Sequence, residues 1–276
     1  MPKLSVTIIT RNEAAQIGSA VASVAWADEI VVVDCGSTDD TVAVARRQGA
    51  RVLHRDWTGY VDQKNFAAAQ AVHDWILSVD ADERVTSPLA AEIQQLLSAD
   101  PPLAGYRVPR VSWYLGTWIR TTDWYPDHQL RLYHRARGRW TPRRVHESVS
   151  LDGQPGKLTG ELEHLPYRDV SHHLQTMDHY TSLAAADMHQ QGRRAGLTSL
   201  LVHPCAAFLR NYIARGGIRQ GTVGLVISAL NAHYVFLKFL KLWELQREAS
   251  GFRLQDSVGP RPAGVEPPAR DKVPEP

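Results

Sequence analysis

The first hundred residues predict an α/β fold with a mostly parallel sheet flanked by helices, because strand-like segments alternate with segments of helical spacing. Residues 30–33 form a continuous apolar run, as expected of a strand that is buried on both faces. Acidic residues follow this run and the apolar run at 75–79. Open α/β sheets bind their ligands at the carboxyl ends of the strands, so these acids are candidate site residues.

Apolar spacing and turn residues place each element of this first part. Residues 13–25 carry apolar side chains at helical spacing, and a proline at the start of the last helix suits a first turn. Thr10 and Glu13 have the spacing of a capping box. The predicted strands are 4–9, 30–33, 51–54 and 75–79. The predicted helices are 13–25, a helix that Ser37 or Thr38 caps and that runs to Gln48, 60–72, and a helix from Pro88 to about Leu97.

The rest of the chain divides into three further segments. Residues 105–165 combine aromatic residues with arginines in alternating runs, which predicts strands mixed into the same sheet. Residues 170–248 read as helical, and the chain beyond 250 holds six of the 16 prolines without apolar periodicity. We therefore expect a domain at 1–168 with halves at 1–100 and 101–168, a helical extension at 169–249 and a disordered tail at 250–276.

Composition excludes several classes of protein. Lysine and arginine total 31 and aspartate and glutamate 29, and this balance excludes a polyelectrolyte that coats nucleic acid. Two cysteines, Cys35 and Cys205, exclude a disulfide framework and indicate a reducing compartment. The N-terminal apolar run is too short for a secretory signal, and residues 222–237 are uncharged but too short and too polar for a secure membrane span.

Asp80 and Asp82 follow the fourth strand and are two residues apart, so their side chains point to the same side if the strand continues. Two neighbouring carboxylates favour a cation between them, and their hard oxygen atoms suit Mg²⁺ or Mn²⁺. The alternative interpretation of Asp80 and Asp82 is an ordinary polar turn at the end of a strand. Asp34 has the same position after residues 30–33, where a carboxylate can bind a ribose hydroxyl or a base, or simply order an ordinary turn.

Taken together, these segments resemble a known family. The residues that carry the resemblance are 6–13, 30–41, 63–65 and 78–83, extended by 26–29, 124–127, 131–132, 145–147 and His164. They are similar to the successive motifs of family 2 glycosyltransferases with the GT-A fold, and most similar to the branch of lipopolysaccharide core β-glucosyltransferases. The resemblance covers residues 3–170 and extends more loosely to 244.

The resemblance implies an inverting, metal-dependent transfer of a sugar from a nucleotide-diphosphate sugar. A divalent cation, Mg²⁺ or Mn²⁺, would stabilise the leaving diphosphate. The implied donor-binding residues are Thr10, Arg11, Asn12, Glu13, Asp34, Gly36, Lys64, Asn65 and Asp80. The implied metal ligands are Asp82, Asp80 and His164, with His146 as another candidate.

An inverting transfer also needs a carboxylate that takes the proton of the acceptor hydroxyl. The resemblance favours Glu147 in this role, with Asp127 as the alternative; Glu147 could instead pair with Arg143 or Arg144 on a strand surface. Aromatic residues and arginines in the second half can stack on sugars and bind phosphate groups. The acceptor residues predicted in this way are Trp118, Trp124, Tyr125, Arg131 and His146.

The resulting hypothesis is a bacterial enzyme that transfers glucose from UDP-glucose to a lipid-linked saccharide, the heptose of lipopolysaccharide inner core, on the cytoplasmic face of the membrane. Arginines around residues 193–241 indicate a membrane-surface face, although a helical dimer interface or a plain helical cap would explain them too. The alternatives are synthesis of another surface polysaccharide, or a non-catalytic nucleotide- or RNA-binding module. Neither a dinucleotide-binding nor a P-loop glycine motif is present.

Overall fold

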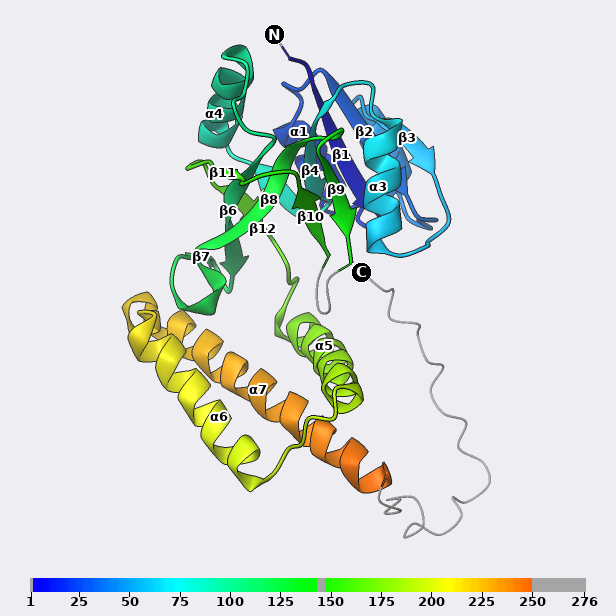
Figure 1. The fold of residues 1–276 in the computed structure, drawn as a ribbon. Coiled ribbons are helices and arrows are strands. Elements are labelled where there is room, and N and C mark those ends of the chain that lie inside the picture. Colours follow the sequence, from blue (N-terminus) through cyan, green and yellow to red (C-terminus); the bar gives the residue numbers. More distant parts are fainter. Residues whose placement is uncertain (1, 143–146, 250–276) are drawn as a thin grey trace.

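The computed structural model describes residues 2–142 and 147–249; the tail predicted for 250–276 lies outside these residues. Within them, a mixed sheet with flanking helices forms one part, and three long helices form a second part next to it (Figure 1). The predicted fold class is therefore confirmed. The long helices begin at Val170, next to the predicted boundary at 168.

The first half of the sheet is parallel, with the order β3-β2-β1-β4. Its elements are β1 (Leu4–Thr10), α1 (Ile17–Ser23), β2 (Glu29–Asp34), α2 (Thr41–Arg47), β3 (Arg51–His54), α3 (Tyr60–Gln70) and β4 (Trp75–Asp80). In the register, Thr10 pairs with Asp34 and Ile9 with Asp80. The last residues of three strands therefore meet at one edge.

The second half of the sheet is mixed and continues in the order β4-β8-β6-β12-β5. Its elements are β5 (Glu83–Val85), α4 (Ser87–Ser98), β6 (Gly105–Tyr114), β7 (Thr117–Ile119), the 3₁₀ turn η1 (Thr122–Trp124), β8 (Asp127–His134), β11 (Gly156–Lys157) and β12 (Leu162–His164). Strand β8 is antiparallel to both neighbours. A separate hairpin pairs β9 (Gly138–Thr141) with β10 (Ser148–Leu151).

Alternation along the parallel strands fills two cores. Leu4, Val6 and Ile8 of β1 pack with apolar residues of α1, α2 and α4 on one face. Val31 and Val33 of β2 pack on α3 on the other face. Both faces of these strands are therefore covered, which explains their nearly unbroken apolar sequence.

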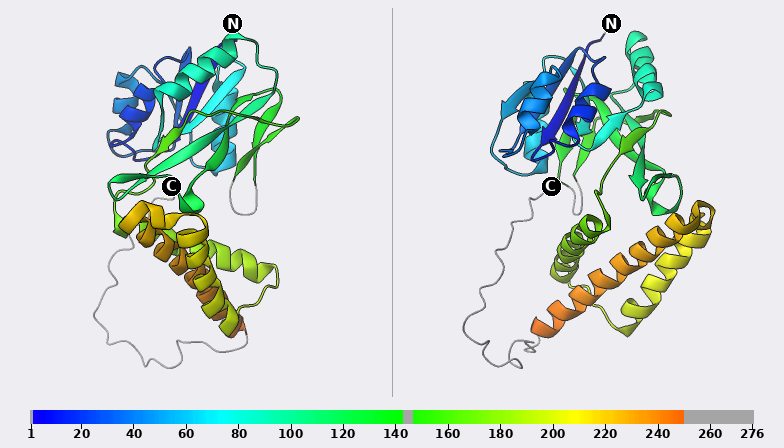
Figure 2. Two further views of the ribbon diagram at one scale, coloured as in Figure 1. Left: turned by 90° about the vertical axis from the view of Figure 1, so that its left-hand side faces the viewer. Right: turned by 180° about the vertical axis from the view of Figure 1, so that it is seen from behind.

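The helical part consists of α5 (Val170–Gln190), α6 (Leu197–Leu209) and α7 (Gly221–Ala249), with the π turn η2 (Arg210–Ala214) and the 3₁₀ turn η3 (Gly217–Gln220) between α6 and α7. Helix α7 lies between α5 and α6, as Figures 1 and 2 show. Ala185, Met188, Ala195, Phe239 and Leu242 form its small buried core.

Asp123 of η1 anchors the helical part to the sheet. Its carboxylate accepts hydrogen bonds from Arg210, Asn211 and Asn231, and Arg215 lies 2.9 Å away. Burial alone would raise the pKa of Asp123, but the hydrogen bonds from Arg210 and Asn211 outweigh it and lower the pKa. A charged Asp123 is therefore favoured at this junction.

Two predictions of helix caps are wrong. Helix α2 begins at Thr41, so neither Ser37 nor Thr38 caps it. Thr10 and Glu13 form no capping box, because Thr10 is still in β1 and α1 begins only at Ile17. In both cases, polar side chains or backbone groups bind the loops at the edge of the sheet and do not cap a helix.

The apolar stretch at 222–237 also differs from its prediction. It belongs to a helical segment, Gly217–Glu248, that is long and apolar enough to cross a membrane by length and composition alone. This segment is nevertheless packed in part against α5, α6 and the sheet.

The junction predicts a pH-dependent stability. His173 of α5 is buried, stacks on Tyr167 and lies 2.8 Å from the Tyr114 hydroxyl. Burial, and secondarily His172, lowers the pKa of His173 to about 4, below the value near 6.5 of an unfolded chain. The unfolded state therefore binds an extra proton between these values, and stability should fall by up to about 3 kcal/mol as pH drops from 6.5 to 4.

Urea unfolding at several pH values measures this loss. We expect His173→Phe to keep the ring packing and to flatten the pH dependence, whereas His179→Phe at an exposed position of the same helix should leave it unchanged. An unaltered slope in His173→Phe would contradict this account.

Candidate active site

Two loops at the carboxyl edge of the sheet are held together by side chains of the predicted donor residues. The Asp34 carboxylate, which is 4% exposed, accepts hydrogen bonds from the backbone N–H groups of Gly36 and Ser37. The N–H of Asn12 donates to Ser37 Oγ, and Asn12 Oδ1 accepts from the N–H of Thr38. Asp34 thus orders the loop that would frame a nucleoside, and its direct contact with a base stays a prediction.

The remaining donor residues of β1 and its loop lie at the same edge. Thr10 Oγ1 is buried and has no hydrogen-bond partner within the described parts of the chain. Arg11 is exposed, and Gly36 has a φ of +88°, a conformation that favours glycine. Burial, followed by the charge of Asp82, raises the pKa of Glu13 to about 7.

A line of alternating charges crosses the site, and we call it the charge chain. Its members in order are Glu147, Lys64, Asp80, Arg131, Glu83, Arg110 and Asp127. The successive nitrogen–oxygen distances are 3.1, 3.0, 2.5, 2.5, 3.1 and 2.7 Å. Four carboxylates alternate with three cations, so each buried charge has an opposite partner.

Glu83 holds the centre of the charge chain. It is fully buried, and its Oε1 accepts hydrogen bonds from Arg110 and Arg131 while its Oε2 accepts from the backbone N–H of Asp80. Glu83 belongs to the sequence motif at 78–83, but no role was predicted for it or for Arg110. An acid directly after two site carboxylates was the available signal for Glu83, whereas nothing local marks Arg110.

Asp80 carries a charge that its neighbours strongly stabilise. Burial alone would raise the pKa of Asp80, but Arg131 and Lys64 outweigh it and hold the pKa far below its usual range. Each oxygen of the carboxylate already faces a cation, Lys64 at 3.0 Å and Arg131 at 2.5 Å. A third cation beside them is electrostatically unfavourable, so we do not place a metal on Asp80.

Asp82 and His164 form a separate pair next to the charge chain. Asp82 Oδ2 lies 3.2 Å from His164 Nε2, and Ser112 Oγ lies 3.3 Å from the other ring nitrogen. Strand pairing creates this contact, since His164 sits opposite Glu83 of β5 and Ser112 of β6. Within the described residues, no group of three or more His, Cys, Asp or Glu side chains has metal-binding geometry.

This pair fits a divalent cation that takes its other ligands from a diphosphate and water. A carboxylate oxygen and an imidazole nitrogen are both ligands of Mn²⁺-type ions, and the hydrogen bond to the second ring nitrogen fixes the orientation of the imidazole.

The two base candidates occupy opposite ends of the charge chain. Glu147 is 24% exposed at its side chain and contacts Lys64. Asp127 is 33% exposed and accepts two hydrogen bonds from Arg110 and one from Gln129. Asp127 is therefore committed to its partners, while Glu147 keeps more of its oxygen atoms available.

Several predicted ligand-binding residues have structural contacts instead. Asn65 exchanges two hydrogen bonds with the backbone of Trp140 in β9, so its amide holds that strand. Lys64 lies over the Trp140 ring at 4.4 Å. Arg131 is 3% exposed within the charge chain, so the acceptor contact predicted for its guanidinium is not supported.

The aromatic residues predicted for the acceptor divide in the same way. Trp124 packs against Tyr114, Tyr167 and His173 at the junction with the helical part. The Tyr125 hydroxyl donates to Glu161. Trp118 is half-buried and packs edge-to-face on Trp113. His146 lies outside the described residues.

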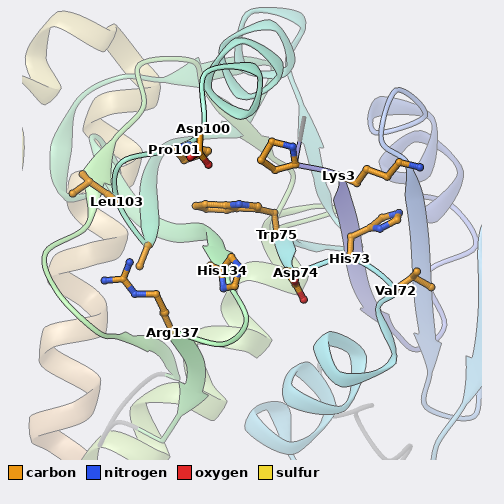
Figure 3. Close-up of a pocket in the computed structure, with 12 residues that line it drawn as sticks. Lys3, Val72, His73, Asp74, Trp75, Asp100, Pro101, Leu103, His134 and Arg137 are labelled. Atoms are coloured by element: carbon orange, nitrogen blue, oxygen red, sulfur yellow. The ribbon is translucent and has the colours of Figure 1, made fainter.

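A cavity of about 510 Å³ opens at the other end of β4 (Figure 3). Lys3, His73, Trp75, His134 and Arg137 line part of it. It lies at the amino end of the parallel strands, so it is distinct from the edge where the predicted site residues gather.

Comparisons with known proteins give a consistent result. The sequence profile described as Glycosyl transferase family 2 matches residues 5–150. The lipopolysaccharide core biosynthesis glycosyltransferase LpsC of Rhizobium meliloti is 32% identical over 88% of this chain and 94% of its own length. An uncharacterized glycosyltransferase of Rickettsia typhi is 32% identical over 93% of this chain and 92% of its own length.

Among solved structures, the mannosyltransferase PcManGT of Pyrobaculum calidifontis, in complex with GDP-Man and Mn²⁺, shares the fold. It aligns over 88% of each chain with a TM-score of 0.53 and 15% identity.

The charge chain predicts a large effect of removing its centre. Glu83→Gln would leave Arg110 and Arg131 partly uncompensated in the interior, at an expected cost of about 3–5 kcal/mol of unfolding free energy. Asp74→Asn is the matched control, because its pair with Arg135 is exposed and should contribute about 1 kcal/mol or less. Equal losses in urea unfolding would show that the burial of the chain is not what matters.

Proposed function

The chain belongs to glycosyl transferase family 2 and has the GT-A fold, and from this premise we propose that it is an inverting hexosyltransferase that uses a nucleotide-diphosphate sugar. One observation carries the proposal. Asp34, Asp80, Asp82 and Lys64 gather with the ordered loops of β1 and β2 at the carboxyl edge of the sheet, where α/β folds bind nucleotides.

In this proposal, Asp82 and His164 hold the divalent cation, Mg²⁺ or Mn²⁺. When bound, the cation neutralises the diphosphate as it leaves. Lys64, with its ammonium group already in the site beside Asp80, adds a second positive charge near the phosphates. Thr10, Asn12 and Glu13 frame the nucleoside together with the Asp34 loop.

The transfer then proceeds by a single displacement. The acceptor hydroxyl oxygen bonds to the anomeric carbon, while the bond from that carbon to the diphosphate oxygen breaks and its electron pair leaves with the nucleotide. Glu147 takes the hydroxyl proton, and the configuration at the anomeric carbon inverts. Asp127 already accepts two hydrogen bonds from Arg110 and one from Gln129, and this supports Glu147 as the base.

The similarity to a lipopolysaccharide core glycosyltransferase supports the finer parts of the proposal. We expect UDP-glucose as donor and heptose of the inner core as acceptor, with the enzyme peripheral on the cytoplasmic face of the membrane. The 1–168 part would carry catalysis and the 169–249 part would associate with the membrane. Transfer of labelled sugar from several nucleotide sugars to defined acceptors tests this, and transfer only to other polysaccharide acceptors would point to a different envelope polymer.

The base assignment predicts unequal effects of two isosteric changes. Glu147→Gln should lower kcat by at least about 100-fold, because general-base catalysis contributes about 10²–10⁴-fold, with UDP binding nearly unchanged. Asp127→Asn should lower kcat less and lower stability, because it breaks the pair with Arg110. If only Asp127→Asn removes turnover while UDP still binds, the two roles must be exchanged.

The metal assignment predicts that Asp82→Asn loses the cation-dependent part of nucleotide binding. The thermal shift produced by UDP with Mn²⁺ should fall to that of UDP alone, and transfer should be lost. The control is Asp28→Asn. Asp28 accepts a hydrogen bond from the N–H of Leu4 and lies at the opposite edge of the sheet. Full turnover of Asp82→Asn at saturating Mn²⁺ and donor would refute the metal role of Asp82.

A further inference from the structure

We propose that the exposed apolar side of α6 and η2 is the surface on which this enzyme lies against an anionic phospholipid bilayer. This inference rests on the proposed function, in which the acceptor is lipid-linked and the 169–249 part associates with the membrane. It goes further by naming the surface, its partner and the orientation that follows.

The surface consists of large apolar side chains that face water. Leu197, Leu201, Leu209 and Ile213 are 73%, 56%, 54% and 62% exposed, and the adjacent Val202 is 54% exposed. Leu197 and Leu201 are four residues apart, and so are Leu209 and Ile213; this spacing keeps the side chains of each pair on one side of a helix. We call these five residues the α6 stripe.

Nothing in the described parts of the chain covers the α6 stripe. The opposite side of α6 packs on α7, where Ala207 is buried and Leu200 joins the core of the helical part. Half of the 14 large hydrophobic side chains that are exposed in the described residues lie between Leu197 and Leu225. An apolar area of this kind on a water-soluble surface marks an interaction site.

The charge around the α6 stripe indicates which partner binds it. Residues 188–243 contain no aspartate or glutamate, although the whole chain has 29 acids against 31 bases. The basic residues in this interval are Arg193, Arg194, Arg210, Arg215, Arg219, Lys238 and Lys241. Arg193 and Arg194 precede the α6 stripe, and Arg210, Arg215 and Arg219 lie at its other end, so arginines flank the apolar side chains as in helices that lie in an anionic membrane interface.

The same charges disfavour a second copy of the chain as the partner. Arg210 and Arg215 already pair with Asp123, but Arg193, Arg194 and Arg219 have no ion pair within the described residues. Two copies that met through the α6 stripe in a symmetric dimer would bring these three arginines close to those of the other copy, without any acid of residues 188–243 to compensate. An anionic lipid surface provides that compensation.

Helix α7 is better explained as the support of this surface than as a membrane span. Asn231 of α7 donates to Asp123, and Lys241 of α7 donates to Asp178 and to Thr181 of α5. Ser228 is fully buried. Insertion of α7 would break these contacts, whereas contact through α6 preserves all of them.

The orientation that results suits a lipid-linked acceptor. The carboxyl edge of the parallel strands faces the helical part (Figure 1). Tyr180 of α5 interacts electrostatically with Glu147, Asp80 and Asp82, which places α5 beside the site. With the α6 stripe on the bilayer and Asp123 tying η1 to η2 and α7, the acceptor side of the site is held near the membrane surface.

Vesicle flotation tests the proposal with the full-length protein. The double variant Leu201→Asp/Leu209→Asp replaces two members of the α6 stripe by charges that anionic lipid repels. Leu183→Asp is the matched control, because Leu183 of α5 is 54% exposed but lies outside the stripe. Vesicles of phosphatidylcholine with phosphatidylglycerol are compared with phosphatidylcholine alone.

We expect the unaltered protein and Leu183→Asp to float with the anionic vesicles, and the double variant to lose at least about 90% of this binding. Flotation that is equal in all three proteins, or absent in the unaltered one, would overturn the proposal. A dimer in size-exclusion chromatography with light scattering that the double variant converts to a monomer would assign the stripe to a second copy instead.

The thermal shift with UDP and Mn²⁺ separates this inference from the proposed function. The double variant should keep that shift, which shows that it is folded and that its donor site is intact. Loss of the shift in every form, including the unaltered protein, would contradict the proposed function while flotation still decides the role of the α6 stripe.

Discussion

The buried carboxylate of Glu83 is the constraint on which the arrangement of the site depends. A charge without water must have cationic partners, and Glu83 obtains them from Arg131 of β8 and Arg110 of β6. In the sheet, β8 runs antiparallel between β4 and β6, and this arrangement brings both arginines to Glu83 at the start of β5. The electrostatics of the site and the topology of the mixed half of the sheet are thus two aspects of one requirement.

This requirement joins the parallel half and the mixed half of the sheet. Asp80 ends β4 in the parallel half of the sheet and Asp127 begins β8 in the mixed half, and the charge chain connects them through pairs of opposite sign. The helical part is attached by the same principle at Asp123, whose carboxylate has partners from η2 and α7. Buried or half-buried acids with several donors therefore mark both connections in the molecule.

Local patterns predicted much of the fold, and their failures have a common cause. The apolar runs and helical spacings gave each strand of the parallel half within a residue or two, because burial on both faces imposes a pattern that the chain itself carries. The predicted caps did not form, because Thr10 is still part of β1 and Ser37 contacts a loop that is distant in sequence. Ser37 Oγ accepts from Asn12, for example, across 25 positions.

The sequence alone therefore determined the α/β class, the acids at the strand ends, the family resemblance and the helical character after residue 170. Only the tertiary structure decided that Arg131 neutralises Asp80 and that Arg110 and Arg131 share Glu83. It also decided that Asn65 holds β9 and that His164 meets Asp82. The physical reason is that periodicity reports which side of an element is buried. Ion pairs and ligand sets depend on which strands become neighbours and in which register. No local sequence pattern predicts the contact of Asp80 with Arg131, 51 positions away, or of Asp82 with His164, 82 positions away.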